Sequence, residues 1–86
     1  MKKLNRSQVY EILDNERDYQ DSRKGGEEHD EQHSVSEWLI LIRKHLNEAE
    51  NAIYDSSNEN AMAAIRKITA MGVAAMEAQG CPRRKE

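Results

Sequence analysis

The stretch from Asn60 to Gly80 constrains the fold of this 86-residue chain more than any other part of it. Its apolar residues recur at steps of three and four, which is the period of one face of an α-helix. Arg66 and Lys67 lie at the centre of the stretch. Much of it is small, so another backbone can pack closely against it; the small residues include Ala61, Ala64, Gly72 and Ala75. The pattern predicts a packing helix that carries a basic pair.

The composition bounds the rest of the chain. With no Phe and one Trp, 86 residues make one domain with a modest core, so oligomerisation is the remaining source of stability. The single Cys81 fits a reducing compartment, and no apolar run approaches the length of a membrane span. We therefore expect a cytoplasmic protein without a signal peptide. The net charge of −3 argues against a broad surface for polymeric DNA or RNA.

Three helices are predicted, at residues 5–22, 35–54 and 59–79, followed by a basic tail at 80–86. Asn5 with Gln8, or Ser7 with Glu11, can cap the first helix, and Ser34 with Glu37 forms a capping box for the second. Between these helices, residues 23–33 contain Gly25-Gly26 and read as a loop. Gly80 and then Pro82 stop the third helix.

The second and third helices form an antiparallel hairpin, because only a short turn beginning at Asp55 separates them. We expect Trp38 in the core. The apolar stripe of the second helix has steps close to a heptad seam and comprises Val35, Trp38, Leu39, Ile42, Leu46, Ala49 and Ile53. The predicted fold is all-α: an N-terminal helix plus an antiparallel hairpin, which assemble into a homo-oligomeric helical bundle.

Metal and nucleophile sites are weakly indicated. His29 and His33 have the i, i+4 spacing of a helical metal pair, but HDEQH is not the HExxH of zinc hydrolases and no third ligand stands out. A solvated loop is the favoured interpretation. Cys81 lies in a basic tail and His45 has no evident acidic partner, so no catalytic triad is predicted.

Acidic residues in the loop keep an enzymatic alternative open. All-α nucleoside triphosphate pyrophosphohydrolases of the MazG type hold Mg²⁺ with ExxE on one helix and ExxD on the next. Glu28 with Glu31 gives ExxE, and Glu27 with Asp30 gives ExxD, but both come from one short segment. The second helix offers Glu48 and Glu50 without ExxD spacing. A phage structural or adaptor protein is a further alternative.

Two basic pairs could hold an anion. Arg23-Lys24 leads into Gly25-Gly26, where free backbone N–H groups could fold over a phosphate; the alternative is an ordinary helix end with favourable cations. Arg66 and Thr69 can reach the same spot on a helix surface. An Arg on such a face needs a partner, from another chain or from a ligand. Tyr10 and Tyr19 could each stack on a base or complete a small core.

The segments ERDYQDSR, HSVSEWLILI and AIRKITAMGVAAMEAQGCPRR together resemble the small phage proteins that sequester cyclic oligonucleotide signals of the CBASS antiphage system. The resemblance covers nearly the whole chain and rests on the helix layout and the terminal helix. It implies an all-helical homohexamer, built from interlocked dimers, that binds cyclic di- and trinucleotides in the host cytoplasm. It implies no cofactor and no catalysis.

The resemblance also implies two sites. Cyclic dinucleotides would sit between protomers, with a Tyr from the first helix and a Lys from the segment after it; Tyr10 and Lys24 match this description, and Arg23 is adjacent. Cyclic trinucleotides would sit near a three-fold axis lined by the terminal helix, where Arg66 and Thr69 are the candidates.

Overall fold

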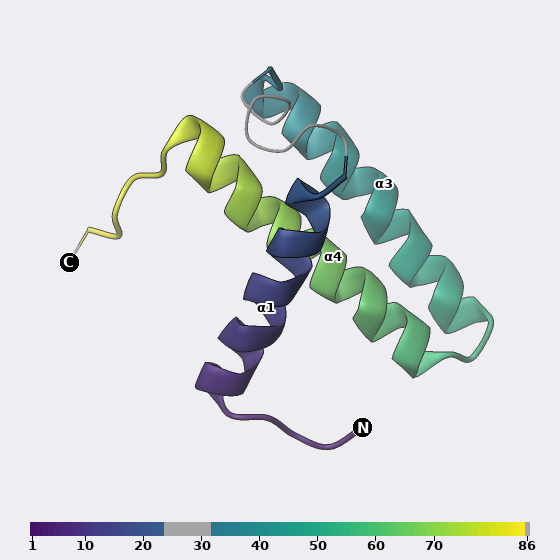
Figure 1. Cartoon of the computed structure of the whole chain (residues 1–86). Helices are drawn as coiled ribbons and strands as arrows, with labels where there is room; N and C mark the ends of the chain where they lie inside the picture. Colours follow the sequence, from purple (N-terminus) through teal and green to yellow (C-terminus); the bar gives the residue numbers. More distant parts are fainter. Residues whose placement is uncertain (24–31, 86) are drawn as a thin grey trace.

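The computed structural model describes residues 1–23 and 32–85, and its secondary structure consists of three helices (Figure 1). Helix α1 runs over Arg6–Asp21, α3 over Val35–Tyr54 and α4 over Asn58–Gln79. These bounds agree with the predicted helices to within one residue at each end. No strand occurs in the two described ranges, so the predicted all-α class is confirmed.

Local side-chain chemistry sets where each helix begins. Asn5 and Gln8 form a reciprocal capping box at α1, with both hydrogen bonds at 2.9 Å. Ser34 and Glu37 form the same motif at α3. The Ser57 hydroxyl accepts the N–H of Asn60 at the start of α4. Each cap satisfies backbone N–H groups that have no partner within the helix, so the starts follow from residues only three positions apart.

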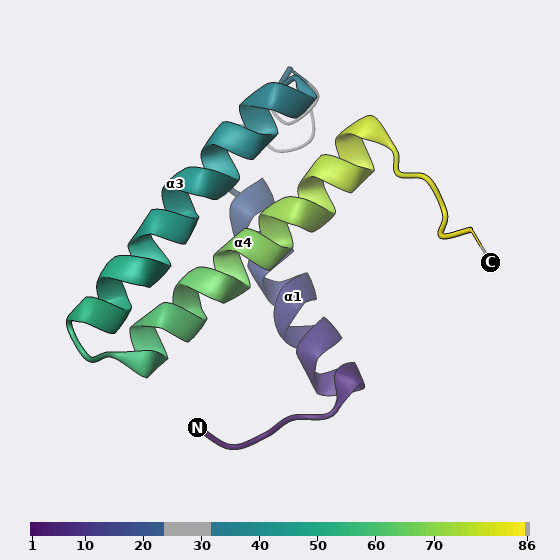
Figure 2. The same ribbon diagram turned by 180° about the vertical axis from the view of Figure 1, so that it is seen from behind.

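The positions where the helices end are also set by neighbouring residues. Gly80 takes φ +77°, a conformation that disfavours any side chain, and its N–H donates to the carbonyl of Met76 at 2.9 Å. The turn between α3 and α4 contains Ser56 at φ +59°. Such a short connection places the two helices side by side and antiparallel, and both views show this hairpin (Figures 1 and 2).

Helix α1 packs against α4 and crosses one side of the hairpin. It lies in front of α4 in Figure 1 and behind it in Figure 2. The two views agree that the opposite side of the hairpin has no helix over it. The N-terminal half of α1 extends beyond the hairpin, and its Val9, Tyr10 and Ile12 side chains are exposed.

The buried core is built from small side chains. Trp38 is buried, as predicted, but every other buried apolar residue is alanine: Ala49, Ala61, Ala64, Ala70 and Ala74. No large side chain in the described residues is fully buried. Alanine contacts let α1 and α3 approach α4 closely, but they remove little apolar surface from water.

The predicted apolar stripe of the second helix does not act as one seam. It divides into Trp38, Ile42 and Ala49, which are buried or half-buried, and a second set that stays exposed: Val35, Leu39, Leu46 and Ile53. The physical reason is that α3 packs on one neighbour, α4, which covers only part of a wide stripe.

In the part of the chain that the structure describes, none of the helices combines the length and the hydropathy of a membrane-spanning segment.

Candidate functional site

A pocket of about 380 Å³ lies where the C-terminal half of α1, the first half of α3 and the middle of α4 meet. This volume falls in the range of small-molecule sites. Three helices contribute to the wall, so the site exists only when α1 is docked on the hairpin. Its lining residues are Glu16, Arg17, Tyr19, Gln20, Arg23, His33, Trp38, Leu41, His45, Lys67, Met71 and Ala74.

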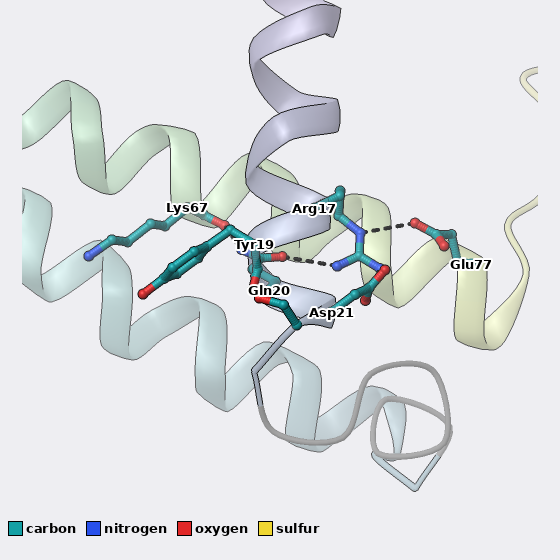
Figure 3. Close-up of polar contacts among 7 residues, drawn as sticks. Arg17, Tyr19, Gln20, Asp21, Lys67 and Glu77 are labelled. Atoms are coloured by element: carbon teal, nitrogen blue, oxygen red, sulfur yellow. Dashed lines mark hydrogen bonds and ion pairs between the residues drawn. The ribbon is translucent and has the colours of Figure 1, made fainter.

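Arg17 and its acceptors form the structural edge of the pocket (Figure 3). Its guanidinium donates to Glu77 at 3.0 Å, to Gln20 at 3.2 Å and to Asp21 at 3.0 Å. Burial by itself lowers the pKa of Arg17, but the hydrogen bond and charge of Glu77, together with Asp21, raise it overall. Arg17 therefore stays charged and fastens α1 to the C-terminal half of α4.

Tyr19, Arg23 and Lys67 form the open, basic side of the pocket. The Arg23 guanidinium carbon lies 5.7 Å from the centre of the Tyr19 ring, within cation–π range. Figure 3 shows Tyr19 and Lys67 extending to the side of α1 away from Glu77. Among the described residues, no carboxylate lies within 4 Å of the Arg23 or Lys67 cations. Lys67 acts on Glu48 at longer range, since its charge adds to the His45 hydrogen bond in lowering the pKa of Glu48, and both cations lie on the open side of the pocket.

The floor of the pocket is formed by aromatic and imidazole groups: Trp38 and His45 of α3, and His33 just before that helix. His33 packs edge-on against Trp38, with ring centres 5.2 Å apart and an interplanar angle of 78°. The Trp38 Nε1 is buried and has no hydrogen-bond partner in the described part of the chain. The Glu48 carboxylate accepts a hydrogen bond from His45 Nδ1 at 3.0 Å, and this hydrogen bond lowers the pKa of Glu48.

Among the described residues, the pocket lining holds three cations (Arg17, Arg23, Lys67) and one carboxylate, Glu16. Arg17 is paired with Glu77 and Asp21, and Lys67 lies close enough to Glu48 to contribute to the lowering of its pKa. The positive charge that faces the open side of the pocket is therefore that of Arg23 and, in part, of Lys67.

Of the dinucleotide residues implied by the resemblance, Tyr10 and Arg23 lie at opposite ends of the first helical segment. Tyr10 is exposed and does not line the pocket. It precedes Glu16, the first pocket residue of α1, by six residues, about 9 Å along the helix axis. Arg23 lines the pocket beside Tyr19 instead. Lys24 lies outside the described residues, as do Gly25, Gly26 and the other candidate loop residues: Glu27, Glu28, His29, Asp30 and Glu31.

Arg66 has an intramolecular partner, whereas the sequence led us to expect one from another chain or a ligand. Its Nε donates to Glu16 Oε1 at 2.7 Å, and the Glu16 side chain is only 8% exposed. The burial of Glu16 in α1 explains this, because a buried carboxylate requires a cation. The Thr69 hydroxyl donates to the Ile65 carbonyl within α4 at 2.8 Å.

Two site residues were missed at the sequence level. Lys67 was noted only as the neighbour of Arg66, and Tyr19 only as one of two tyrosines. Their positions near the middle of α4 and the end of α1 carry no local signal that they converge. Only the structure shows the convergence: Gln20, one residue after Tyr19, donates to the Lys67 carbonyl at 3.4 Å across 47 residues of sequence.

In the described residues, no group of three or more His, Cys, Asp or Glu side chains is placed to hold a metal ion. Comparisons with protein-family models, with curated proteins and with solved structures found no match to this chain.

Proposed function

We propose that this chain is a binding protein that sequesters cyclic nucleotides without cleaving them, and that it uses the pocket between α1, α3 and α4. The observation that carries the proposal is the convergence of Tyr19, Arg23 and Lys67 on one open side of that pocket. An exposed aromatic ring can stack on a base, and two cations with no carboxylate within 4 Å among the described residues can bind phosphate. No catalytic group is needed for this function.

The size of the pocket matches one half of a cyclic dinucleotide better than the whole ligand. At about 380 Å³ it lies near the lower end of small-molecule sites. A cyclic dinucleotide has two bases and two phosphates related by approximate two-fold symmetry. Two copies of the pocket at a two-fold interface would supply one aromatic ring and one pair of cations to each half. A homo-oligomer is therefore part of the proposal.

The resemblance to CBASS-evading phage proteins supplies the biological setting of the proposal. A protein that holds the signal tightly keeps it from host effectors, so affinity and slow release replace turnover. For trinucleotides, Arg66 and Thr69 remain the proposed contacts. Because Arg66 also pairs with Glu16, Thr69→Ala is the cleaner test of that second site.

The test is calorimetric titration of the purified chain with cyclic GMP-AMP, comparing Tyr19→Ala with Tyr10→Ala. The two tyrosines lie on the same helix and are almost equally exposed, at 57% and 59%, so they form a matched pair. We expect Tyr19→Ala to weaken binding at least tenfold, with Tyr10→Ala within twofold of wild type. The reverse result would assign the site to the tyrosine that the resemblance implies.

A charge pair and a recovery assay complete the test. Lys67→Gln should weaken binding about tenfold or more, since a charge-assisted phosphate contact is lost, whereas Lys44→Gln on the surface of α3 should not. Ligand recovered after denaturing the complex should be intact. A linear product, or pyrophosphate released from nucleoside triphosphates with Mg²⁺, would replace the proposal with a hydrolytic function of the MazG type.

A further inference from the structure

One ring nitrogen of His45 is held outside the pocket, which leaves the other for a ligand. Its Nδ1 donates to the Glu48 carboxylate at 3.0 Å, three residues further along α3. His45 lines the pocket, whereas Glu48 does not. Because the two nitrogens of an imidazole point in nearly opposite directions, Nε2 points away from Glu48, to the side on which the pocket lies. Within residues 1–23 and 32–85, Nε2 makes no hydrogen bond.

The Glu48 carboxylate also decides what Nε2 can do. An ionised carboxylate only accepts hydrogen bonds, so the neutral ring of His45 carries its hydrogen on Nδ1. Nε2 is then an acceptor, which repels a phosphate oxygen. A second proton makes Nε2 a donor and the ring a cation, and both changes favour a phosphate. Histidine is the side chain that ordinarily changes between these two states from about pH 5 to about pH 8.

Two lysines lie near the same carboxylate. The His45 hydrogen bond is the main cause that lowers the pKa of Glu48, and the charges of Lys67 from α4 and Lys44 from α3 add to it. One carboxylate is therefore shared by His45 and two further cations. A protonated His45 lacks a second negative charge, and the side on which it lacks one is the pocket side.

The groups that α1 turns towards the pocket do not supply that charge. Its one carboxylate there, Glu16, pairs with Arg66 at 2.7 Å. Arg17 pairs with Glu77 and Asp21, and the remaining titratable groups of this wall are Tyr19 and Arg23. An anion that enters beside Lys67 would therefore be the first negative charge on the Nε2 side of His45.

We propose that His45 is a further ligand of the phosphate that Lys67 binds, and that its Nε2 takes up one proton from solvent as the anion enters the pocket. This inference rests on the proposed function, because it concerns how the same pocket holds phosphate. Anion and proton favour each other reciprocally. The contribution of His45 to affinity is therefore complete in acid and is lost as the pH rises through the range in which the bound ring gives up its proton.

The first experiment is calorimetric titration with cyclic GMP-AMP, whose phosphodiesters keep their charge over the whole range used. Two buffers of different ionisation enthalpy measure the protons taken up. We expect affinity at about pH 5.5 to exceed that at about pH 8.5 at least fivefold, with net proton uptake near neutrality. His45→Gln should remove at least half of both effects. Affinity independent of pH, or unchanged uptake in His45→Gln, would overturn the proposal.

A matched pair of glutamates tests the role given to Glu48. Glu48→Gln removes the charge that favours the protonated ring, so the pH at which affinity falls should move down by about half a unit or more. Glu50→Gln changes the net charge of the chain equally, and Glu50 is exposed on the same helix with no ion pair in the described part of the chain. It should not move that pH. Equal shifts in both variants would assign the effect to net charge and contradict the proposal.

A probe without a nucleotide separates this inference from the proposed function. The imidazole nitrogens of His45 are titrated by NMR with sulfate, whose charge is constant in this range, against sodium chloride at equal ionic strength. We expect sulfate to raise the midpoint of the Nε2 titration by about half a unit or more. If cyclic GMP-AMP binds at no pH, the proposed function fails and sulfate decides: a raised midpoint supports the anion site at His45, and an unchanged midpoint overturns it.

Discussion

Glu16 and Arg17 are the two buried side chains of α1, and both are charged. Adjacent on the helix, they reach different parts of α4: Glu16 pairs with Arg66, and Arg17 pairs with Glu77. The two ion pairs have opposite polarity, because α1 supplies the acid in one and the base in the other. They fix both the position and the direction of α1, since a reversed α1 would bring like charges together. Charge, rather than apolar packing, therefore specifies how α1 docks.

The Glu16–Arg66 pair predicts an asymmetric mutational result. Arg66→Met leaves a buried carboxylate without its cation and should lower the free energy of unfolding by about 1–2 kcal/mol, a value reduced because Arg66 is itself partly exposed. Replacing both residues, as Glu16→Leu with Arg66→Met, should recover most of that loss. Urea unfolding measures both variants, with Lys44→Met as the control. A double variant less stable than the single one would contradict the argument.

Glu37 predicts a pH dependence at the start of α3. Hydrogen bonding to the Ser34 backbone N–H, then to its hydroxyl, lowers the pKa of Glu37 from 4.5. A lowered folded-state pKa gives stability that is complete above the ordinary value and is lost as the pH falls through the lowered one. The urea midpoint of wild type should exceed that of Glu37→Gln at about pH 6, and the difference should vanish in stronger acid. A difference that stays constant down to about pH 2 would rule this out.

At the scale of the elements, the sequence predicted what is local and missed what is distant. The Asn5–Gln8 and Ser34–Glu37 boxes join residues three apart, so the helix starts could be read directly. The ion pairs that place α1 on α4 join residues 50 and 60 apart. The C-terminal half of α1 is polar, so it has no periodic apolar pattern that would indicate which helix it packs against. For the same reason, the sequence could not distinguish Tyr19 from Tyr10.

Gly72 gives a prediction for α4. Gly72→Ala should stabilise the fold by about 0.5–1 kcal/mol, because alanine favours the helix and an added Cβ meets nothing within 4 Å among the described residues. Thermal unfolding of the variant beside wild type measures the change. A variant less stable than wild type would mean that something packs at Gly72.

At the scale of the whole molecule, the sequence predicts the fold of the chain but leaves open what packs on its apolar stripe. The stripe that includes Leu39 and Leu46 was visible in the sequence, but a helical period does not say whether its partner is α4 or another chain. The structure separates the two roles: Trp38 and Ala49 serve the chain itself, whereas Leu39 and Leu46 remain exposed.

The distances along the chain between contacting helices also set an order of events in folding. The α3–α4 hairpin closes through a short turn, whereas docking α1 closes loops of about 50 to 60 residues, which costs more entropy. We expect Ala49→Gly to slow folding, and Arg66→Met mainly to speed unfolding, in stopped-flow measurements. Equal effects on the folding rate would argue against this order. We therefore expect α1, which is synthesised before α4, to dock only after α4 has been made.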